Sequence, residues 1–171
     1  MSIDLTSFLD RIVSNLHLEE SLKIENINVN GRKIDFTEPV KFTGDIYKVD
    51  EDNFLSGNIH FKYKENCARC LKEFVQEINT AISGKLIEGS KKIKETDEDE
   101  EDLKIYYEGN NIDLTESVVS AIILSLPMKS LCKEDCKGLC PKCGKNLNEG
   151  KCDCVEDYID PRLAKLKEFL Q

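Results

Sequence analysis

The cysteines carry the most specific chemistry in this sequence. All eight occur as close pairs, and two thiolates a few residues apart can hold one metal ion from a tight turn. Two such pairs complete a tetrahedral site, so eight sulfurs supply two structural four-cysteine zinc sites. The predicted ligands are Cys67 and Cys70, Cys132 and Cys136, Cys140 and Cys143, and Cys152 and Cys154.

Paired cysteines also form disulfides, redox centres and iron–sulfur clusters. Residues 1–20 show no basic start followed by an apolar run, and the longest apolar stretch, near residues 121–124, is too short to span a bilayer. We therefore expect a cytoplasmic protein without a membrane partner. Disulfides are rare in the reducing cytosol. A thioredoxin-like pair needs an activated thiol at a helix start, which no pair here predicts. Zinc is favoured over iron by Cys140-Pro-Lys-Cys143-Gly144, a zinc-ribbon spacing, although an iron–sulfur cluster stays open.

The pairs can combine into two sites in three ways if each pair stays together. Joining Cys140 and Cys143 with Cys152 and Cys154 closes only the loop 144–151. Loop-closure entropy favours this short closure, which leaves the other two pairs to form a long-range site. That long-range site would stabilise the tertiary fold more, because it joins distant segments. The other two partitions stay open.

Charge is unevenly distributed along the chain. The formal net charge of −9 argues against a broad basic surface that binds nucleic acid through its phosphates. Seven of the eight residues 95–102 are acidic, which predicts a solvated loop, either a docking site for a basic partner or a tolerated insertion. Residues 128–171 hold nine basic and eight acidic residues. A modest RNA contact is therefore hypothesised at Lys137, Lys142, Lys145 and Lys151, and simple decoration of solvated loops is the alternative.

Apolar and polar residues alternate over much of the first half of the chain. This period of two, between residues 40 and 86, predicts antiparallel strands with one wet face. Cys67 and Cys70 fall between two such runs, so we expect them at a hairpin tip. Residues 104–107 predict one further strand.

Three helices are expected around these strands. Apolar residues between Leu5 and Leu16 have helical spacing, and Asp4 can cap that helix. A second helix over 113–126 begins with a capping-box pattern and ends before Pro127. A third begins at Asp160, which Pro161 follows.

The predicted fold class is α+β, an antiparallel β-sheet with few packed helices and a cysteine-rich, zinc-knuckle or ribbon-like C-terminal lobe. Residues 1–94 would form the N-terminal helix and the sheet with its CxxC hairpin tip, and 95–102 the acidic loop. Residues 103–171 would contribute a strand, a helix, the zinc lobe and the last helix, in one folding unit with 1–94. The cysteine-rich block has too few apolar residues for a core of its own, so metal would have to order it.

No pattern of catalytic residues stands out. The two histidines, His17 after the first helix and His60 on the polar side of a strand, are expected at the surface. The chain has no GxSxG, Walker A, GxGxxG or HExxH pattern. Closed four-thiolate sites also lack the open position of a catalytic zinc. We therefore expect no enzyme and no small-molecule substrate.

The order of the motifs resembles the YceD family of large-ribosomal-RNA accumulation proteins. The resemblance rests on Cys67-Ala-Arg-Cys70-Leu71, the helix from Asp113 to Pro127, the block from Leu131 through Cys154, and Asp160-Pro161-Arg162-Leu163-Ala164-Lys165-Leu166. It implies a cytosolic, non-enzymatic factor for the synthesis, processing or stability of large-subunit ribosomal RNA. The implied partners are ribosomal RNA or a pre-large-subunit particle, with a basic ribosomal protein as a further candidate.

The resemblance also bears on the ligand pairing. Some members of the family keep the first CxxC and a later ligand pair without the final cysteines, which implies that Cys67 and Cys70 share a site with Cys132 and Cys136. A functional hypothesis from another class is a redox- or metal-responsive zinc adaptor, in which thiol oxidation ejects zinc and unfolds the C-terminal lobe.

Overall fold

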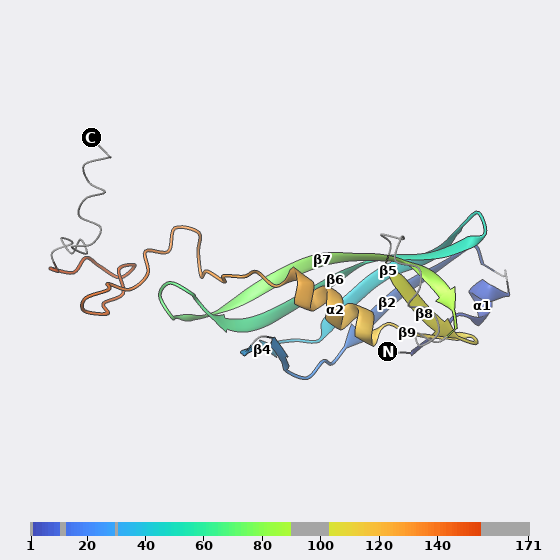
Figure 1. Cartoon of the computed structure of the whole chain (residues 1–171), viewed down its shortest axis with the longest axis horizontal. Helices are drawn as coiled ribbons and strands as arrows, with labels where there is room; N and C mark the ends of the chain where they lie inside the picture. Colours follow the sequence, from blue (N-terminus) through green and yellow to red (C-terminus); the bar gives the residue numbers. More distant parts are fainter. Residues whose placement is uncertain (1, 11–12, 30, 90–102, 155–171) are drawn as a thin grey trace, which may run out of the picture.

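The computed structural model describes residues 2–10, 13–29, 31–89 and 103–154 (Figure 1). The acidic run at 95–102 and the helix expected from Asp160 lie outside the described residues. The described elements are, in chain order, β1 (Ser2–Asp4), α1 (Thr6–Leu9), β2 (Asn15–Leu22), β3 (Ile27–Val29), β4 (Arg32–Phe36), β5 (Val40–Val49), β6 (Asp52–Asn66), β7 (Glu73–Glu88), β8 (Lys104–Glu108), β9 (Asn111–Asp113) and α2 (Thr115–Ser125).

The strands form one sheet, and nearly every described pair is antiparallel, as the alternating pattern predicts. The order runs β1-β9-β8-β7-β6-β4-β3, with β5 pairing both β6 and β2. The exception is β8, which pairs in parallel with the end of β7. Neither α1 nor α2, the helices that the structure describes, is long enough and apolar enough to span a membrane.

The hairpin of β6 and β7 positions the first cysteine pair. Its strands pair continuously from Asn53 opposite Leu86 to Asn66 opposite Glu73. In Figure 1 this hairpin extends past the end of the other strands, toward the cysteine-rich segment. Cys67 and Cys70 lie in the connection between the two strands, which confirms the predicted hairpin tip.

Helix α2 packs against the sheet through one apolar face. Leu114, Val118 and Ile122 are fully buried in the same core as the inward residues of β5 and β6. The Asp113 carboxylate accepts hydrogen bonds from the Thr115 backbone N–H, at 2.9 Å, and from its hydroxyl, at 2.6 Å. These contacts bind the amide and hydroxyl of the first helical residue, as expected near a helix start. The predicted second helix is therefore confirmed over Thr115–Ser125, whereas Asp113, expected to open it, ends strand β9. The chain leaves the helix toward the cysteine-rich block.

The N-terminal helix expected from Leu5 to Leu16 is wrong over most of its length. Helix α1 covers only Thr6–Leu9, and the chain is already in strand β2 by Asn15. Leu16 belongs to β2, which pairs with β5 along its whole length. The ladder bonds to β5 and the burial of Leu18 outweigh the local helical spacing. His17 consequently lies in β2, where its Nδ1 is 2.9 Å from Asp45 Oδ1.

Two glycines make room for an aromatic ring between strands β5 and β6. Gly44 faces Gly57 in the β5–β6 ladder. A Cβ built on Gly57 would lie 2.7 Å from the Phe42 ring, which covers this pair. Phe42 is fully buried, so the missing side chains make room for part of the core.

Candidate metal centre

The hairpin tip and the segment after α2 bring four cysteines together. We call Cys67, Cys70, Cys132 and Cys136 the proximal cluster. The sulfur atoms of Cys67 and Cys136 are 3.7 Å apart, and so are those of Cys70 and Cys132. All four sulfurs lie within 4.8 Å of one another.

The remaining cysteines form a second group farther along the chain. We call Cys140, Cys143, Cys152 and Cys154 the distal cluster, and its sulfurs also lie within 4.8 Å of one another. The two groups follow the partition that the short closure of loop 144–151 favours. All eight cysteines are free thiols rather than disulfide partners.

The spacing of the proximal sulfurs fits a metal ion. A tetrahedral zinc site with Zn–S bonds of about 2.3 Å has sulfur–sulfur edges of roughly 3.8 Å. The two separations of 3.7 Å are close to that edge. The donor set of four thiols is also the one that zinc and iron–sulfur clusters prefer. The residues present therefore fit a four-thiolate metal ion, with Zn²⁺ as the ion that we propose.

The backbone around Cys67 folds into a turn that directs its thiol and that of Cys70 to one side. The Leu71 N–H donates to the Cys67 carbonyl at 2.9 Å, and the Cys67 N–H donates to the Lys72 carbonyl at 2.9 Å. Leu71 has a φ of 58°, in the left-handed region. Such a residue reverses the chain directly after the second ligand.

The first distal pair repeats this turn. The Gly144 N–H donates to the Cys140 carbonyl at 2.9 Å, the Cys140 N–H donates to the Lys145 carbonyl at 2.9 Å, and Gly144 has a φ of 73°. The glycine after Cys143 was a readable sequence signal for this conformation. The same conformation at Leu71 was missed, because leucine gives no such signal.

Within the proximal cluster, the pKa of Cys67 is lowered and that of Cys132 is raised. Burial raises the pKa of Cys67, but hydrogen bonds from backbone amides of both arms outweigh it and lower this pKa to about 6. Burial and the neighbouring Cys70 and Cys67 thiols raise the pKa of Cys132 to about 12. Four thiolates at this separation repel one another, so full deprotonation requires a cation that balances their charge.

The distal cluster has the same electrostatic pattern. Hydrogen bonds from the backbone amides of Cys143 and Lys142 lower the pKa of Cys140 to about 6. The hydrogen bond with the Cys143 thiol, together with burial, raises the pKa of Cys154 to about 12. Each cluster therefore contains at least one sulfur that the backbone stabilises as an anion, which is the form that binds metal.

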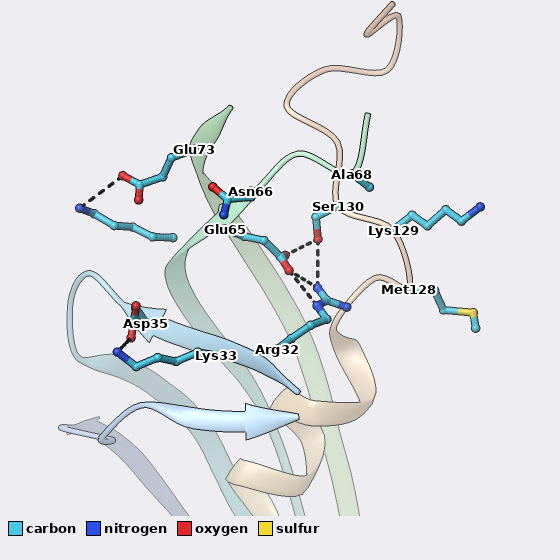
Figure 2. Close-up of a pocket in the computed structure, with 11 residues that line it drawn as sticks. Arg32, Lys33, Asp35, Glu65, Asn66, Ala68, Glu73, Met128, Lys129 and Ser130 are labelled. Atoms are coloured by element: carbon cyan, nitrogen blue, oxygen red, sulfur yellow. Dashed lines mark hydrogen bonds and ion pairs between the residues drawn. The ribbon is translucent and has the colours of Figure 1, made fainter. Parts of the chain in front are cut away.

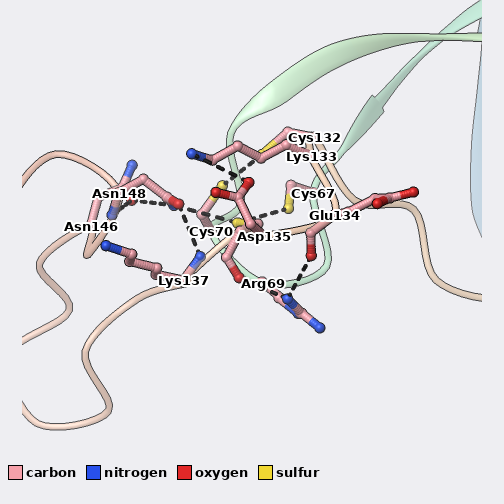
Figure 3. A network of polar contacts seen from close by, with 11 residues as sticks. Cys67, Arg69, Cys70, Cys132, Lys133, Glu134, Asp135, Lys137, Asn146 and Asn148 are labelled. Atoms are coloured by element: carbon pink, nitrogen blue, oxygen red, sulfur yellow. Dashed lines mark hydrogen bonds and ion pairs between the residues drawn. The ribbon is translucent and has the colours of Figure 1, made fainter.

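Arg69 ties the two arms of the proximal cluster together. It lies between Cys67 and Cys70, and its Nη1 donates to the Cys136 carbonyl at 2.8 Å and to the Glu134 carbonyl at 3.3 Å (Figure 3). The Arg69 carbonyl in turn accepts from the Leu139 N–H at 3.2 Å. The guanidinium thus holds the Cys132–Cys136 loop against the hairpin tip through two backbone carbonyls.

A second polar network fixes the segment that enters the proximal cluster. Ser130 is buried; its carbonyl accepts from the Ala68 N–H at 2.9 Å and its hydroxyl donates to the Glu65 carboxylate. Arg32 bonds the same carboxylate through Nε at 2.8 Å (Figure 2). Its Nη1 donates to the Pro127 carbonyl at 3.0 Å. Strand β4, the hairpin and the end of α2 therefore meet at one ion pair.

Sequence reasoning missed this network. One weak signal was available: Glu65 and Ser130 each stand two residues before a ligand pair, at Cys67 and Cys132. Arg32 gives no local signal, because only the pairing of β4 with β6 brings it there.

The clusters differ in exposure to solvent. Cys67, Cys70 and Cys136 are buried and Cys132 is half-buried. In the distal cluster only Cys140 is buried, and Cys143 is exposed. The distal sulfurs are therefore the more accessible to oxidants and chelators.

The four hypothesised RNA-contact lysines are exposed around the distal cluster. Lys137, Lys142, Lys145 and Lys151 all have exposed side chains. The Lys145 ammonium donates to the Lys151 carbonyl at 2.8 Å and thereby closes the loop between the distal ligand pairs. This lysine has a structural contact that the sequence did not indicate.

Neither histidine joins a metal-binding group among the described residues. His60 Nε2 lies 2.6 Å from Glu77 Oε1, and this contact is the main cause of the lowered pKa of Glu77. His60 is partly exposed, on the β6 side that we expected to be polar.

Comparison with known proteins gives several related sequences. A protein of Mycobacterium tuberculosis named uncharacterized protein Rv2926c is 32% identical over 125 residues, which cover 73% of this chain and 59% of that protein. Uncharacterized protein YlbN of Bacillus subtilis is 35% identical over 77 residues, 44% of this chain and 45% of that protein. No solved structure matches this chain.

A plant relative has a more informative name. The Arabidopsis thaliana protein named large ribosomal RNA subunit accumulation protein YCED homolog 1, chloroplastic, is 36% identical over 67 residues, 37% of this chain and 21% of that protein. This chain spans about three fifths of the length of its mycobacterial relatives.

The family comparison covers both cysteine clusters. The model of the family described as large ribosomal RNA subunit accumulation protein YceD matches residues 55–170, more than half of the chain. The match begins in strand β6, ahead of Cys67, and runs through the last cysteine, Cys154. The chain belongs to the YceD family.

Proposed function

We propose that this protein is a cytoplasmic, non-enzymatic factor that supports the synthesis, processing or stability of large-subunit ribosomal RNA, and that two zinc ions shape its C-terminal lobe. The ribosomal part of this proposal rests on the family description. The zinc part rests on one observation, the convergence of four sulfurs from two distant segments within 4.8 Å.

Zinc in the proximal cluster would cross-link the hairpin tip to the segment after α2. These two segments are separated by more than 60 residues, and two of the sulfur–sulfur separations between them match the edge of a tetrahedral site. A site with four thiolates has no open position for substrate, so the metal would supply structure rather than Lewis-acid chemistry. Metal-binding free energy would then be folding free energy for the lobe.

The charge distribution favours a contact with RNA that is confined to the lobe. A chain with a net charge of −9 repels phosphates over most of its surface. The exposed lysines near the distal cluster are the local exception. We therefore expect a weak, salt-sensitive RNA contact, with most affinity coming from a basic ribosomal protein or a structured pre-ribosomal surface.

Ultraviolet crosslinking in cells tests this contact. Lys137→Glu with Lys151→Glu should abolish crosslinked ribosomal RNA while metal content is unchanged. Lys145 is left intact because it closes the distal loop. The matched control, Lys23→Glu with Lys41→Glu, makes the same charge change at exposed positions in the N-terminal half. Equal crosslinking by both double variants would contradict an RNA contact in the lobe.

Complementation tests the ribosomal role itself. Cells that lack the protein should accumulate less mature large-subunit ribosomal RNA, and the wild-type chain should restore it. A Cys67→Ser, Cys136→Ser variant should fail to restore it if the proximal cluster is required. Normal large-subunit RNA in cells that lack the protein would argue against the proposed function.

One observation favours a second candidate, the redox- or metal-responsive adaptor. Cys143 of the distal cluster is exposed and its neighbours Cys152 and Cys154 are half-buried, so oxidants can reach this cluster. The adaptor hypothesis expects reversible zinc release at mild oxidant, with a loss of function that a reductant reverses. Closed structural sites should keep their zinc under the same conditions.

A further inference from the structure

We propose that Asn148 couples the two cysteine clusters, so that metal in the distal cluster tightens the hold of the proximal cluster on its own metal. This inference rests on the proposed metal sites. Asn148 lies in the loop 144–151, which joins the distal ligand pairs, yet its side chain reaches a sulfur of the other cluster. Its Nδ2 donates to Cys136 Sγ at 3.4 Å (Figure 3).

The surrounding hydrogen bonds fix the orientation of the Asn148 amide. Its Oδ1 accepts from the Lys137 backbone N–H at 2.9 Å. A backbone N–H can only donate, so the oxygen must face Lys137 and the NH₂ group must face Cys136. The second hydrogen of that group is directed to Asn146 Oδ1, at 2.9 Å. Each polar atom of the side chain therefore has a partner.

The loop that carries Asn148 is held in place by the distal arm. The Leu147 N–H donates to the Gly138 carbonyl at 2.9 Å, and Leu139 pairs with Asn146 as an isolated bridge. Residue Lys145 closes the loop through its bond to the Lys151 carbonyl. Metal bound by Cys140, Cys143, Cys152 and Cys154 would clamp both ends of this loop and so hold Asn148 against Cys136.

An N–H···S bond matters to a four-thiolate site because such a site carries excess negative charge. Four thiolates around a dication leave a net charge of −2, and each donor to a sulfur stabilises that charge. Groups that bond to metal ligands, without being ligands, typically contribute about 10- to 100-fold in metal affinity. Coupling of this kind is reciprocal, so metal in the proximal cluster tightens the distal cluster by the same factor.

Titration with ¹¹³Cd²⁺ tests the coupling, because nuclear magnetic resonance can resolve the two clusters. Cys67→Ser assigns the proximal signal in the full chain, and competition with a chelator gives the affinity of each cluster. In Asn148→Asp, the oxygen facing Lys137 is kept and the donor facing Cys136 becomes an acceptor. Proximal affinity for Cd²⁺ should fall 10- to 100-fold. Asn148→Ala, which removes the donor without adding charge, should show a loss in the same direction.

Asn146→Asp is the matched control. It places the same new charge in the same loop and keeps the oxygen that Asn148 uses, and the only donor it removes among the described contacts is the exposed one from Asn146 Nδ2 to Glu149 Oε1. Its proximal affinity should stay within threefold of wild type. Circular dichroism of the sheet, measured on every variant, separates loss of fold from loss of affinity.

A double-mutant cycle distinguishes coupling from a local effect. In a Cys143→Ser, Cys152→Ser background, where the distal cluster cannot close, the proximal affinity should already be low and Asn148→Asp should change it by less than threefold. The coupling is overturned by equal losses from Asn148→Asp in both backgrounds, by no loss at all, or by a loss confined to the distal signal. Absence of Cd²⁺ binding to the wild-type chain would instead refute the proposed metal sites.

Discussion

Replacing Leu71 by glycine should stabilise the protein, because Leu71 has a backbone conformation that glycine adopts more easily. Its φ is 58°, and the equivalent position in the distal turn is Gly144, with a φ of 73°. A side chain in the left-handed region costs about 1–2 kcal/mol. Glycine removes that cost but loses about 0.5–1 kcal/mol of additional backbone entropy on folding. The Leu71 side chain is 67% exposed, so little packing is lost.

The expected net gain for Leu71→Gly is about 0.5–1 kcal/mol in the free energy of unfolding of the zinc-loaded chain. For a chain of this length, that gain corresponds to an increase in Tm of roughly 1–4 °C. Urea denaturation and calorimetry measure both quantities.

Leu71→Ala is the control for this prediction. It removes the same exposed side chain but keeps a Cβ at a positive φ, so it should give no gain. A Leu71→Gly variant no more stable than Leu71→Ala would refute the left-handed turn at Leu71, and with it the equivalence of the two CxxC turns.

Three further predictions concern the sheet, the start of α2 and the ion pair near the proximal cluster. Gly57→Ala should cost about 1–3 kcal/mol in urea denaturation, because its Cβ would lie 2.7 Å from the Phe42 ring; a neutral effect would contradict the close approach of the ring. Asp113→Asn should cost up to about 1 kcal/mol at pH 7. The side-chain and backbone hydrogen bonds from Thr115 lower the pKa of Asp113 from 3.8 to about 2, so this contribution is fully present above the unfolded pKa and is lost as pH falls through about 2. The difference between wild type and Asp113→Asn should therefore shrink as the pH approaches 2 and disappear below it in acid denaturation, and a difference that persists well below pH 2 would count against the hydrogen-bonded carboxylate. Glu65→Gln should cost about 2–4 kcal/mol, because it leaves the half-buried Arg32 without its anion. Arg32→Met combined with Glu65→Gln should recover part of that loss in the same denaturation assay, and purely additive losses would argue against a direct ion pair.

Much of the site could be predicted from local patterns. The alternation in β6 and β7 located the hairpin and therefore the Cys67 pair at its tip. The short loop 144–151 indicated which cysteines meet in the distal cluster, because loop-closure entropy is a property of chain separation alone. Gly144 indicates a left-handed turn, because glycine is the residue that most often adopts that conformation.

The features that the sequence did not predict have a common physical cause: each depends on contacts between segments that are distant in the chain. Residues 5–16 have a helical spacing, yet the ladder with β5 takes Leu16 and His17 into a strand. Arg32 reaches Glu65 and Pro127 only because β4 pairs with β6. Asn148 contacts Cys136 through the folding of the distal loop onto the proximal arm. No local pattern encodes contacts of this kind.

The zinc content of the intact chain tests the central claim most directly. Native mass spectrometry of protein purified under reducing, anaerobic conditions should show two zinc ions per chain. Cys67→Ser with Cys136→Ser should leave one, bound by the distal cluster. Fewer than two zinc ions in the wild-type chain, or iron with visible charge-transfer absorption, would contradict the account.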